Sequence, residues 1–460
     1  MPISPARKIA FEVLRRVEAE GAYASDLLHT ELTAAVKSED AALATEIVMG
    51  VLRWRLLLDF LLERELKKPV ARLDLAVLLA LRMGMYQLRF LDRIPARAVV
   101  NEAAELVKRA RKASAASLVN AVLRRASLQR TPPAELLPAE ISKAERLGIL
   151  YSHPAWMVER WMALWGEECT VQLLQADNRA PQLSCAIHEI SRRQEIVAAL
   201  EASGLRVAPG NILKDAISVS GGSPARTEAF RAGQISIQDE ASQAIPLLLG
   251  VERGQRVLDL CAAPGGKTAA LARAAGSNGL VIAADLHGHR LRAMQTQCER
   301  LQLGRVRLIE LDAREPLPFS ATFDRILVDA PCSGSGTLAR HPEIRWRLEP
   351  GALAEFHALQ TAILRRAIEK LAPGGRLVYS TCSLEPEENE NVISEALRES
   401  SRPAQLRAAG AKEVVLRLES FLTSGIAAAS LINERGQFHT FPGAQPCDGF
   451  FAAILESPKN

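Results

Sequence analysis

Between residues 251 and 395, apolar runs of strand length alternate with stretches of helical periodicity, and this alternation limits the possible folds more than any other feature. The runs of strand length are Arg256–Cys261, Leu280–Leu286, Val306–Leu311, Ile326–Asp329 and Leu377–Ser380. Helical patterns separate them at Thr268–Ala275, His289–Leu301 and Leu353–Leu371. Because strand–helix–strand units join parallel neighbours by right-handed crossovers, this region predicts a doubly wound α/β sheet. A last apolar run, Phe450–Leu455, is predicted to add an edge strand.

The rest of the chain predicts two further domains, in keeping with a length of 460 residues. Residues 1 to about 128 show helical periodicity throughout, whereas the proline-containing stretch after Arg130 interrupts it. The section that follows mixes helical patterns at Ala155–Ala176 and Arg193–Ser203 with short strands at Leu183–Ile187 and Ile217–Val219. We therefore predict an all-α bundle at 1–130, a linker at 131–144, a small α+β domain at 145–250 and the α/β domain at 251–460.

Charge and cysteine content narrow the class of protein. Residues 1–130 contain 22 Lys and Arg against 15 Asp and Glu, whereas the whole chain carries only +4. Seven cysteines without a CxxC pair argue against a disulfide scaffold or a structural zinc site, and no metal is expected. The chain begins with an amphipathic pattern and not an apolar signal, and no segment has the roughly 20 apolar residues of a membrane span. These features predict a cytoplasmic protein with reduced thiols and no membrane partner.

A glycine turn follows the first strand of the α/β region, in Cys261–Thr268. Such a turn brings bare backbone and a helix N-terminus against a ligand, and Asp285, at the end of the next strand, is placed to bind ribose hydroxyls. The turn lacks the glycine that a P-loop requires at Cys261 and is not GxGxxG. We therefore predict S-adenosylmethionine as cofactor; a turn that only tightens a strand–helix joint is the alternative. The predicted cofactor-binding residues are Cys261, Ala262, Ala263, Pro264, Gly265, Gly266, Lys267, Asp285, Asp312 and Asp329.

Two cysteines directly follow strands of the same sheet. Cys332 comes after Asp329-Ala-Pro, and Cys382 comes after Ser380-Thr. A thiolate can attack the electron-poor C6 of a pyrimidine, which makes C5 able to take up a methyl group, and a carboxylic acid such as Asp329 near base N3 would stabilise the adduct. Buried, inert cysteine is the alternative for either thiol. The remaining cysteines, at 169, 185, 261, 298 and 447, are predicted to be structural.

Two basic segments are candidates for contact with nucleic acid. One is the cluster of Lys108, Arg109, Arg111 and Lys112 in the predicted bundle. The other is the segment of Arg340, His341, Arg345 and Trp346, whose cations and aromatic ring suit phosphates and stacked bases. A solvated helix face and a packed surface loop are the respective alternatives.

The motifs together resemble those of the RNA cytosine-C5 methyltransferases of the Nol1/Nop2/Sun family. The segments that carry the resemblance are Asp259–Thr268, Asp329–Gly334, Arg340–Trp346, Tyr379–Glu390 and Asp448–Phe451, with Gly233–Ser242 as an entry to the catalytic domain. In the helical region, Arg93–Glu102 and Ser117–Leu123 resemble the NusB-type RNA-binding domain. The fusion is similar to bacterial enzymes that methylate small-subunit rRNA, and the similarity covers nearly the whole chain.

The resemblance implies a Rossmann-like methyltransferase domain and a role for each thiol. Cys382 would be the nucleophile and Cys332 would assist product release, although DNA cytosine methyltransferases use a Pro-Cys nucleophile and the residues alone do not rank the two. The implied partner is small-subunit rRNA, bound by a monomer. Relatives usually carry an arginine in the strand that corresponds to Pro181–His188, and this chain does not. A non-catalytic RNA-binding or ribosome-assembly protein with a methyltransferase-like fold is the alternative, against which the intact Cys332, Cys382 and Asp285 argue.

Overall fold

The computed structural model describes residues 3–32, 36–129, 131–399 and 406–459. Its contacts group the chain into two units, of which the first contains residues 1–180 and 338–347 and the second contains residues 181–337 and 348–460. The first unit thus takes in the helices up to residue 180 and a short segment from the α/β region. Among the described helices, none is both long and apolar enough to cross a membrane.

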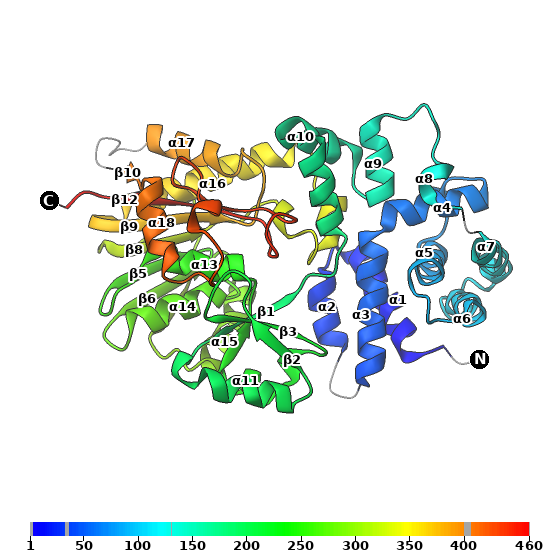
Figure 1. Cartoon of the computed structure of the whole chain (residues 1–460), viewed down its shortest axis with the longest axis horizontal. Coiled ribbons are helices and arrows are strands. Elements are labelled where there is room, and N and C mark those ends of the chain that lie inside the picture. The colour runs from blue at the N-terminus through cyan, green and yellow to red at the C-terminus, as the bar shows by residue number, and fades with distance from the viewer. Residues whose placement is uncertain (1–2, 33–35, 130, 400–405, 460) are drawn as a thin grey trace. The chain divides into compact units, whose positions relative to one another are not determined.

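The first unit is helical, as the sequence predicts, and Figure 1 shows its helices in blue to green. Apolar residues at helical spacing on α1, α3, α5, α6 and α7 meet in one buried core. Helices α3 and α4 meet at Trp54, whose backbone is not helical. The helices are α1 (Pro5–Glu20), α2 (Ala24–Glu31), α3 (Ser38–Arg53), α4 (Arg55–Leu66), α5 (Leu75–Phe90), α6 (Ala96–Arg109), α7 (Ala116–Leu128), α8 (Pro133–Leu136), α9 (Lys143–Tyr151) and α10 (Ala155–Asp177).

Residues 338–347 complete the first unit from a distant part of the sequence. The Arg345 side chain is fully buried there, and its guanidinium donates to the backbone oxygens of Ser152 and Asp177 at 3.1 and 3.2 Å. The Trp346 indole donates to the Leu52 oxygen at 2.9 Å, and the Glu343 carboxylate accepts from the Ala24 N–H at 2.9 Å. The segment is therefore a buried part of the helical unit.

The second unit begins with a small antiparallel sheet of strand order β2-β3-β1-β4. β1 (Leu183–Ile187) pairs with both β3 (Ala216–Ser220) and β4 (Ile235–Ile237), and β2 (Arg206–Pro209) pairs with β3. Helix α11 (Arg193–Ala202) contributes Ile196 and Leu200 to the core on this sheet, and α12 (Glu228–Arg231) precedes β4. The predicted α+β domain is present in outline, although its first predicted helix, α10, belongs to the first unit.

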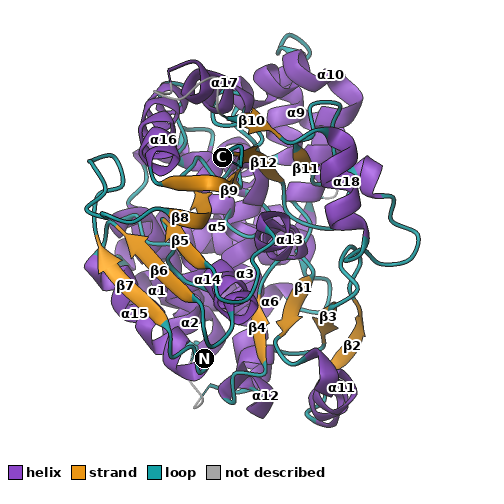
Figure 2. Ribbon diagram, turned by 90° about the vertical axis from the view of Figure 1, so that its left-hand side faces the viewer, coloured by secondary structure: helices purple, strands orange, loops and turns teal. Residues whose placement is uncertain are grey.

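The large sheet has the order β10-β12-β9-β8-β5-β6-β7, with β11 paired to β12, and Figure 2 shows its parallel strands side by side. Alternating side chains separate its faces: Val257 and Leu327 pack in the core with α13, α14 and α18, whereas Leu258 and Ile326 pack in the core with α16 and α17. The strands are β5 (Arg256–Leu260), β6 (Leu280–Asp285), β7 (Val306–Glu310), β8 (Phe323–Asp329), β9 (Leu371–Thr381), β10 (Arg407–Ala408), β11 (Phe438–Thr440) and β12 (Phe450–Glu456). The helices are α13 (Glu240–Leu249), α14 (Gly266–Ala275), α15 (Gly288–Arg300), α16 (Ala352–Glu369), α17 (Glu390–Glu399) and α18 (Ala411–Glu419).

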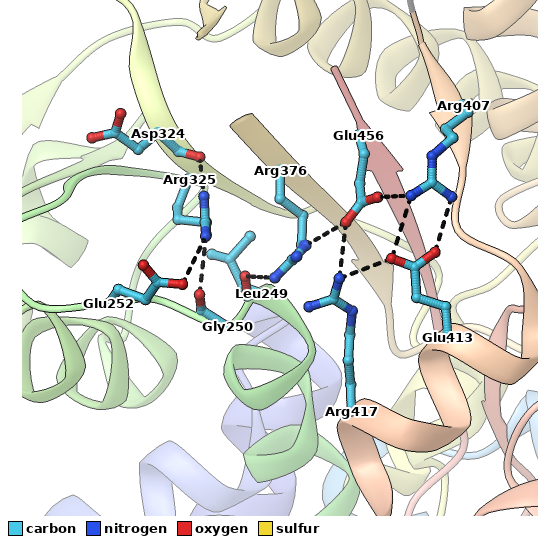
Figure 3. Close-up of polar contacts among 10 residues, drawn as sticks. All are labelled: Leu249, Gly250, Glu252, Asp324, Arg325, Arg376, Arg407, Glu413, Arg417 and Glu456. Atoms are coloured by element: carbon cyan, nitrogen blue, oxygen red, sulfur yellow. Dashed lines mark hydrogen bonds and ion pairs between the residues drawn. The ribbon is translucent and has the colours of Figure 1, made fainter. Parts of the chain in front are cut away.

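The position of β12 corrects the predicted edge strand. β12 runs antiparallel to β9 and also pairs with β10 and β11, so it lies inside the sheet. A network of ion pairs joins its end to neighbouring elements (Figure 3): the Glu456 carboxylate contacts Arg376 on β9, Arg407 on β10 and Arg417 on α18. The strand is thus held from both sides.

Candidate active site

The strand order places the candidate residues at the carboxyl ends of neighbouring strands. From β5 the chain moves outward through β6 and β7, whereas β8 and β9 lie on the other side of β5, so the order reverses between β5 and β8. Ligands of open α/β sheets bind at such a reversal, outside the carboxyl ends of the strands. The glycine turn follows β5, Asp329 ends β8, and Cys382 directly follows β9.

The two predicted thiols converge. The Sγ atoms of Cys332 and Cys382 lie 3.3 Å apart in a hydrogen bond, although the residues are 50 positions apart in sequence. Both cysteines are free and partly exposed. The pKa of the Cys332 thiol is raised well above its ordinary value, first by the hydrogen bond with Cys382 and then by burial. Cys332 therefore strongly favours its protonated form.

Asp329 lies at the end of β8 in contact with the glycine-turn helix. Its two carboxylate oxygens accept hydrogen bonds from Lys267 Nζ at 2.7 Å and from Ser380 Oγ at 2.8 Å. The Lys267 ammonium also lies 5.1 Å from the centre of the Phe450 ring. This arrangement fixes a lysine and a carboxylate from different elements beside each other at the crevice.

The glycine turn is built as a ligand-binding loop requires. Gly265 has φ of +101° and caps α14, and a Cβ at this position would lie 3.0 Å from the Met294 side chain. Asp285 is buried at the end of β6, where its carboxylate accepts from the backbone N–H groups of Ala263 at 3.3 Å and His287 at 3.0 Å. Oδ2 also pairs with the Arg290 guanidinium at 3.4 Å, whereas Oδ1, which accepts from His287, has a second lone pair for a ribose hydroxyl. Bare backbone, a helix N-terminus and this carboxylate fit an adenosine-containing cofactor.

The other predicted cofactor residues lie on the same edge of the sheet. Asp312 follows β7 and forms an ion pair with Arg314, whose hydrogen bond is the main cause of the lowered pKa of the Asp312 carboxyl. The Cys261 thiol packs against the core of the sheet, and burial raises its pKa, in agreement with a structural thiol. Ala262 and Ala263 are buried within the turn.

Two buried acids were missed by the sequence analysis. Asp259 lies within β5 and accepts from Thr268 Oγ1 at 2.5 Å. Glu388 is fully buried between the cysteine-bearing loops and accepts from Ser333 and Ser383, which directly follow the two cysteines. For Glu388, the signal in the sequence was the acidic run after Cys382, and such a run does not reveal what its carboxylates contact.

The two basic segments that were predicted to contact nucleic acid differ in their surroundings. In the cluster of residues 108–112, Lys108 forms an ion pair with Glu105 and Lys112 with Asp74, each at 2.7 Å. Arg345 and Trp346 correct the expectation of RNA contact, because Arg345 is fully buried and Trp346 is hydrogen-bonded inside the helical unit. His341 packs edge to face with Tyr23, and burial lowers the pKa of its imidazole. Arg340 is partly buried. The described residues contain no group of His, Cys, Asp and Glu suited to a metal ion.

Family models match each part of the chain. The model described as 16S rRNA methyltransferase RsmB/F matches residues 246–456, the NusB family model matches residues 4–127, and a model of the RsmF/B-like ferredoxin-like domain matches residues 153–226. These matches cover most of both units.

Similar proteins span the same length. The chain is 33% identical to a probable ribosomal RNA small subunit methyltransferase B of Bacillus subtilis, with 87% of this chain and 89% of that protein aligned. It is 31% identical to ribosomal RNA small subunit methyltransferase B of Klebsiella pneumoniae, with 99% and 98% aligned. Among solved structures, the protein PH0851 covers 99% of this chain and is itself wholly covered, with a TM-score of 0.81 and 24% identity. NSun6 from Pyrococcus horikoshii with SFG covers 68% of this chain and is wholly covered, with a TM-score of 0.58 and 20% identity.

Proposed function

The chain belongs to the family of 16S rRNA methyltransferases RsmB/F, and from that membership we propose that it methylates C5 of a cytosine in small-subunit rRNA through a covalent cysteine adduct. The family makes it an RNA methyltransferase that depends on S-adenosylmethionine. The observation that supports the cytosine chemistry best is the pair of thiols 3.3 Å apart at the cofactor crevice. Small-subunit rRNA is the substrate, and a bacterial rRNA enzyme of this kind acts in the cytoplasm.

The residues of the glycine turn would hold the cofactor. Asp285 would bind the ribose, and the turn at Gly265 and Gly266 would lie against the adenosine and the rest of the molecule. Asp312 would reach the adenine amino group. When bound, S-adenosylmethionine supplies an electrophilic methyl group on a sulfonium sulfur.

Cys382 would begin the reaction. Its thiolate forms a bond to C6 of the cytosine, and the electron pair of the C5–C6 double bond moves toward N3 and C5, which makes C5 nucleophilic. Asp329, which contacts Lys267 and Ser380, would lie near base N3 and, in its carboxylic acid form, donate a hydrogen bond that stabilises the negative charge developing there. The cytosine must first leave any base stack, because a thiol cannot reach C6 inside a duplex.

Cys332 would complete the reaction by assisting release. After C5 has taken up the methyl group, the C5 proton passes to a base or to solvent, the double bond to C6 forms again, and the bond between C6 and Cys382 breaks with its electron pair returning to the Cys382 sulfur. The basic helical unit would hold the rRNA, with Lys108, Arg109, Arg111 and Lys112 as candidate phosphate contacts and Arg340 and His341 as further candidates.

The two thiols provide the test, because the mechanism gives their variants opposite phenotypes. We expect Cys382→Ala to methylate nothing and to form no adduct. We expect Cys332→Ala to attack but to stall at release, so that RNA migrates with the protein on a denaturing gel. The double variant should show no such band, and Cys169→Ala, which changes an exposed cysteine, should behave as the wild type.

Other outcomes are equally informative. A band that appears in Cys382→Ala and depends on Cys332 would show that the roles are exchanged. Full activity in both single variants without any trapped RNA would refute covalent catalysis. Bisulfite sequencing of the rRNA then identifies the modified cytosine.

A further inference from the structure

The carboxylate of Glu388 connects the two loops that carry the paired thiols. One oxygen, Oε1, accepts from the Ser333 backbone N–H at 2.8 Å and from Gln360 Nε2 at 2.9 Å. The other oxygen, Oε2, accepts from the hydroxyls of Ser333 and Ser383. Ser333 directly follows Cys332 and Ser383 directly follows Cys382, so one side chain is bonded to the neighbour of each thiol.

Other contacts also hold the same two loops. Ser383 Oγ lies 3.1 Å from Ser333 Oγ and 3.4 Å from Ser335 Oγ, and the Leu384 N–H donates to Ser335 Oγ at 2.9 Å. The Gly336 N–H donates to the Cys382 oxygen, and the Ala330 N–H donates to the Ser380 oxygen, both at 2.9 Å. Gln360 also donates to the Pro331 oxygen at 2.9 Å. In addition to these direct contacts, the Glu388 carboxylate accepts from the residue after each cysteine and from Gln360, so one group bonds both loops.

An ionised carboxylate at this buried position lowers the stability of the fold. Glu388 is fully buried, and burial is the main cause that raises the pKa of its carboxyl, whereas the hydrogen bonds from Ser333, Ser383 and Gln360 lower it. Its named partners are all neutral donors, so no cation balances the charge among them. A buried charge without a cation is retained at a cost to stability, and such groups are frequent at functional sites.

The Glu388 carboxylate also affects the pKa of the Cys332 thiol. Glu388 is one of the groups that raise the pKa of the Cys332 thiol, after Cys382 and burial. The carboxylate thus favours the protonated form of Cys332.

We propose that Glu388 is a positioning residue that holds the Cys332 and Cys382 loops in register, so that one thiol attacks C6 while the other remains poised for release. The inference rests on the proposed function, because it assigns a task to the same pair of thiols. Glu388 itself touches neither the base nor the cofactor in this scheme and acts through Ser333 and Ser383.

The first test measures covalent attack directly. Small-subunit rRNA transcribed with 5-fluorocytidine provides the probe, because C5 then has no proton to lose and the bond between C6 and Cys382 persists. We expect Glu388→Gln to form this adduct roughly 10 to 100 times more slowly than the wild type, with S-adenosylmethionine affinity unchanged, since a small misplacement of reacting groups has costs of this size. Glu388→Asp, which keeps the charge, should recover part of the rate.

A matched control separates positioning from stability. Glu240 is another buried carboxylate, and it accepts from the backbone N–H groups of Asn211, Ile212 and Leu213, each at 2.8 Å. Glu240→Gln should lower stability in the same way but leave the rate of adduct formation within about twofold of the wild type. Ser383→Ala is a milder variant of the proposed contact, and its effect should not add to that of Glu388→Gln, because both remove one interaction.

A second readout does not need RNA. Diamide oxidises two neighbouring thiols to a disulfide, and its azo group takes up the two hydrogens that the thiols lose. We expect the wild type and Glu240→Gln to close a bond between Cys332 and Cys382, and Glu388→Gln and Ser383→Ala to close it several times more slowly. If Glu388→Gln kept the wild-type rate in both assays, the proposal would be wrong. A wild type that forms no RNA adduct would refute the proposed function, and the diamide rates would still decide whether Glu388 positions the thiols.

Discussion

Asp259 is the buried acid whose ionisation is most strongly disfavoured by its surroundings at the cofactor edge of the sheet. Its Oδ1 atom has no hydrogen-bond partner among the described residues, and only Thr268 donates to Oδ2. Burial, with repulsion from Asp329 and Asp285, raises the pKa of its carboxyl from 3.8 to about 7. The folded protein therefore retains a proton on Asp259 that the unfolded chain releases above about pH 4.

This difference predicts how Asp259→Asn changes stability with pH. Because the folded-state pKa is raised, the wild type loses stability as pH rises from about 4 to about 7, and the loss is complete above that range. The asparagine variant has no such proton, so its stability relative to the wild type should be greater at pH 8 than at pH 5 by roughly 2–3 kcal/mol. Urea unfolding of both proteins at the two pH values measures this quantity. An equal difference at both values would show that Asp259 is ionised in the folded protein.

At the scale of elements, the position of β12 is stabilised by ion pairs as well as by its backbone hydrogen bonds to neighbouring strands. The Glu456 carboxylate is largely buried and serves three arginines, of which Arg407 and Arg417 also contact Glu413 (Figure 3). These contacts lower the pKa of the Glu413 carboxyl to about 2, chiefly through its hydrogen bond with Arg407. Without Glu456, Arg407 and Arg417 would share Glu413, and Arg376 would lose its carboxylate partner.

We therefore expect Glu456→Gln to lower the free energy of unfolding by about 1–3 kcal/mol, because it removes the carboxylate partner of the largely buried Arg376. Glu228→Gln is the control, since Glu228 pairs with Arg231 three residues away and both side chains are more than half exposed. That change should stay within about 0.5 kcal/mol. Denaturant unfolding of both variants compares the two effects, and a Glu456→Gln effect as small as the control would mean that the strand ladder alone holds β12.

The sequence predicts elements well where a local pattern is sufficient. The five strands of the parallel sheet follow from apolar runs between helical stretches, and Cys332 and Cys382 could be placed together because both follow strands of that sheet. The place of β12 could not be predicted, because an apolar run does not reveal which strands it pairs with. The contacts of Glu388 and Arg345 were missed for a related reason, since their partners lie on other elements.

At the scale of the whole molecule, two separate segments of the chain, residues 1–180 and 338–347, make up the helical unit. Arg345 is the central residue of the second contribution, and burial lowers the pKa of its guanidinium to about 10. The Asn178 side-chain oxygen accepts from it at 3.0 Å, in addition to the backbone oxygens of Ser152 and Asp177. A motif residue that looked suited to RNA is thus a structural tie within one unit.

We expect Arg345→Met to destabilise the protein by about 3–5 kcal/mol, because it leaves several buried oxygens without donors. Arg347→Met is the control: its guanidinium donates to the oxygens of Val17 and Ala22, but the residue is exposed, so the change should cost about 1 kcal/mol or less. Thermal unfolding of the two variants measures the difference. If the two changes had equal effects, the buried contacts of Arg345 would contribute little.

The return of residues 338–347 to the helical unit has a consequence for the order in which the nascent chain folds. The ribosome releases the chain from its N-terminus, so helices α1–α10 emerge long before Arg345, which is 168 positions beyond its acceptor at Asp177. Until that segment has emerged, the early helices can collapse around their shared apolar core but keep exposed the oxygens that Arg345 later binds. Completion of the first unit during translation therefore waits until residues 181–337 of the second unit have been synthesised, and a chain truncated before residue 338 leaves both units unfinished.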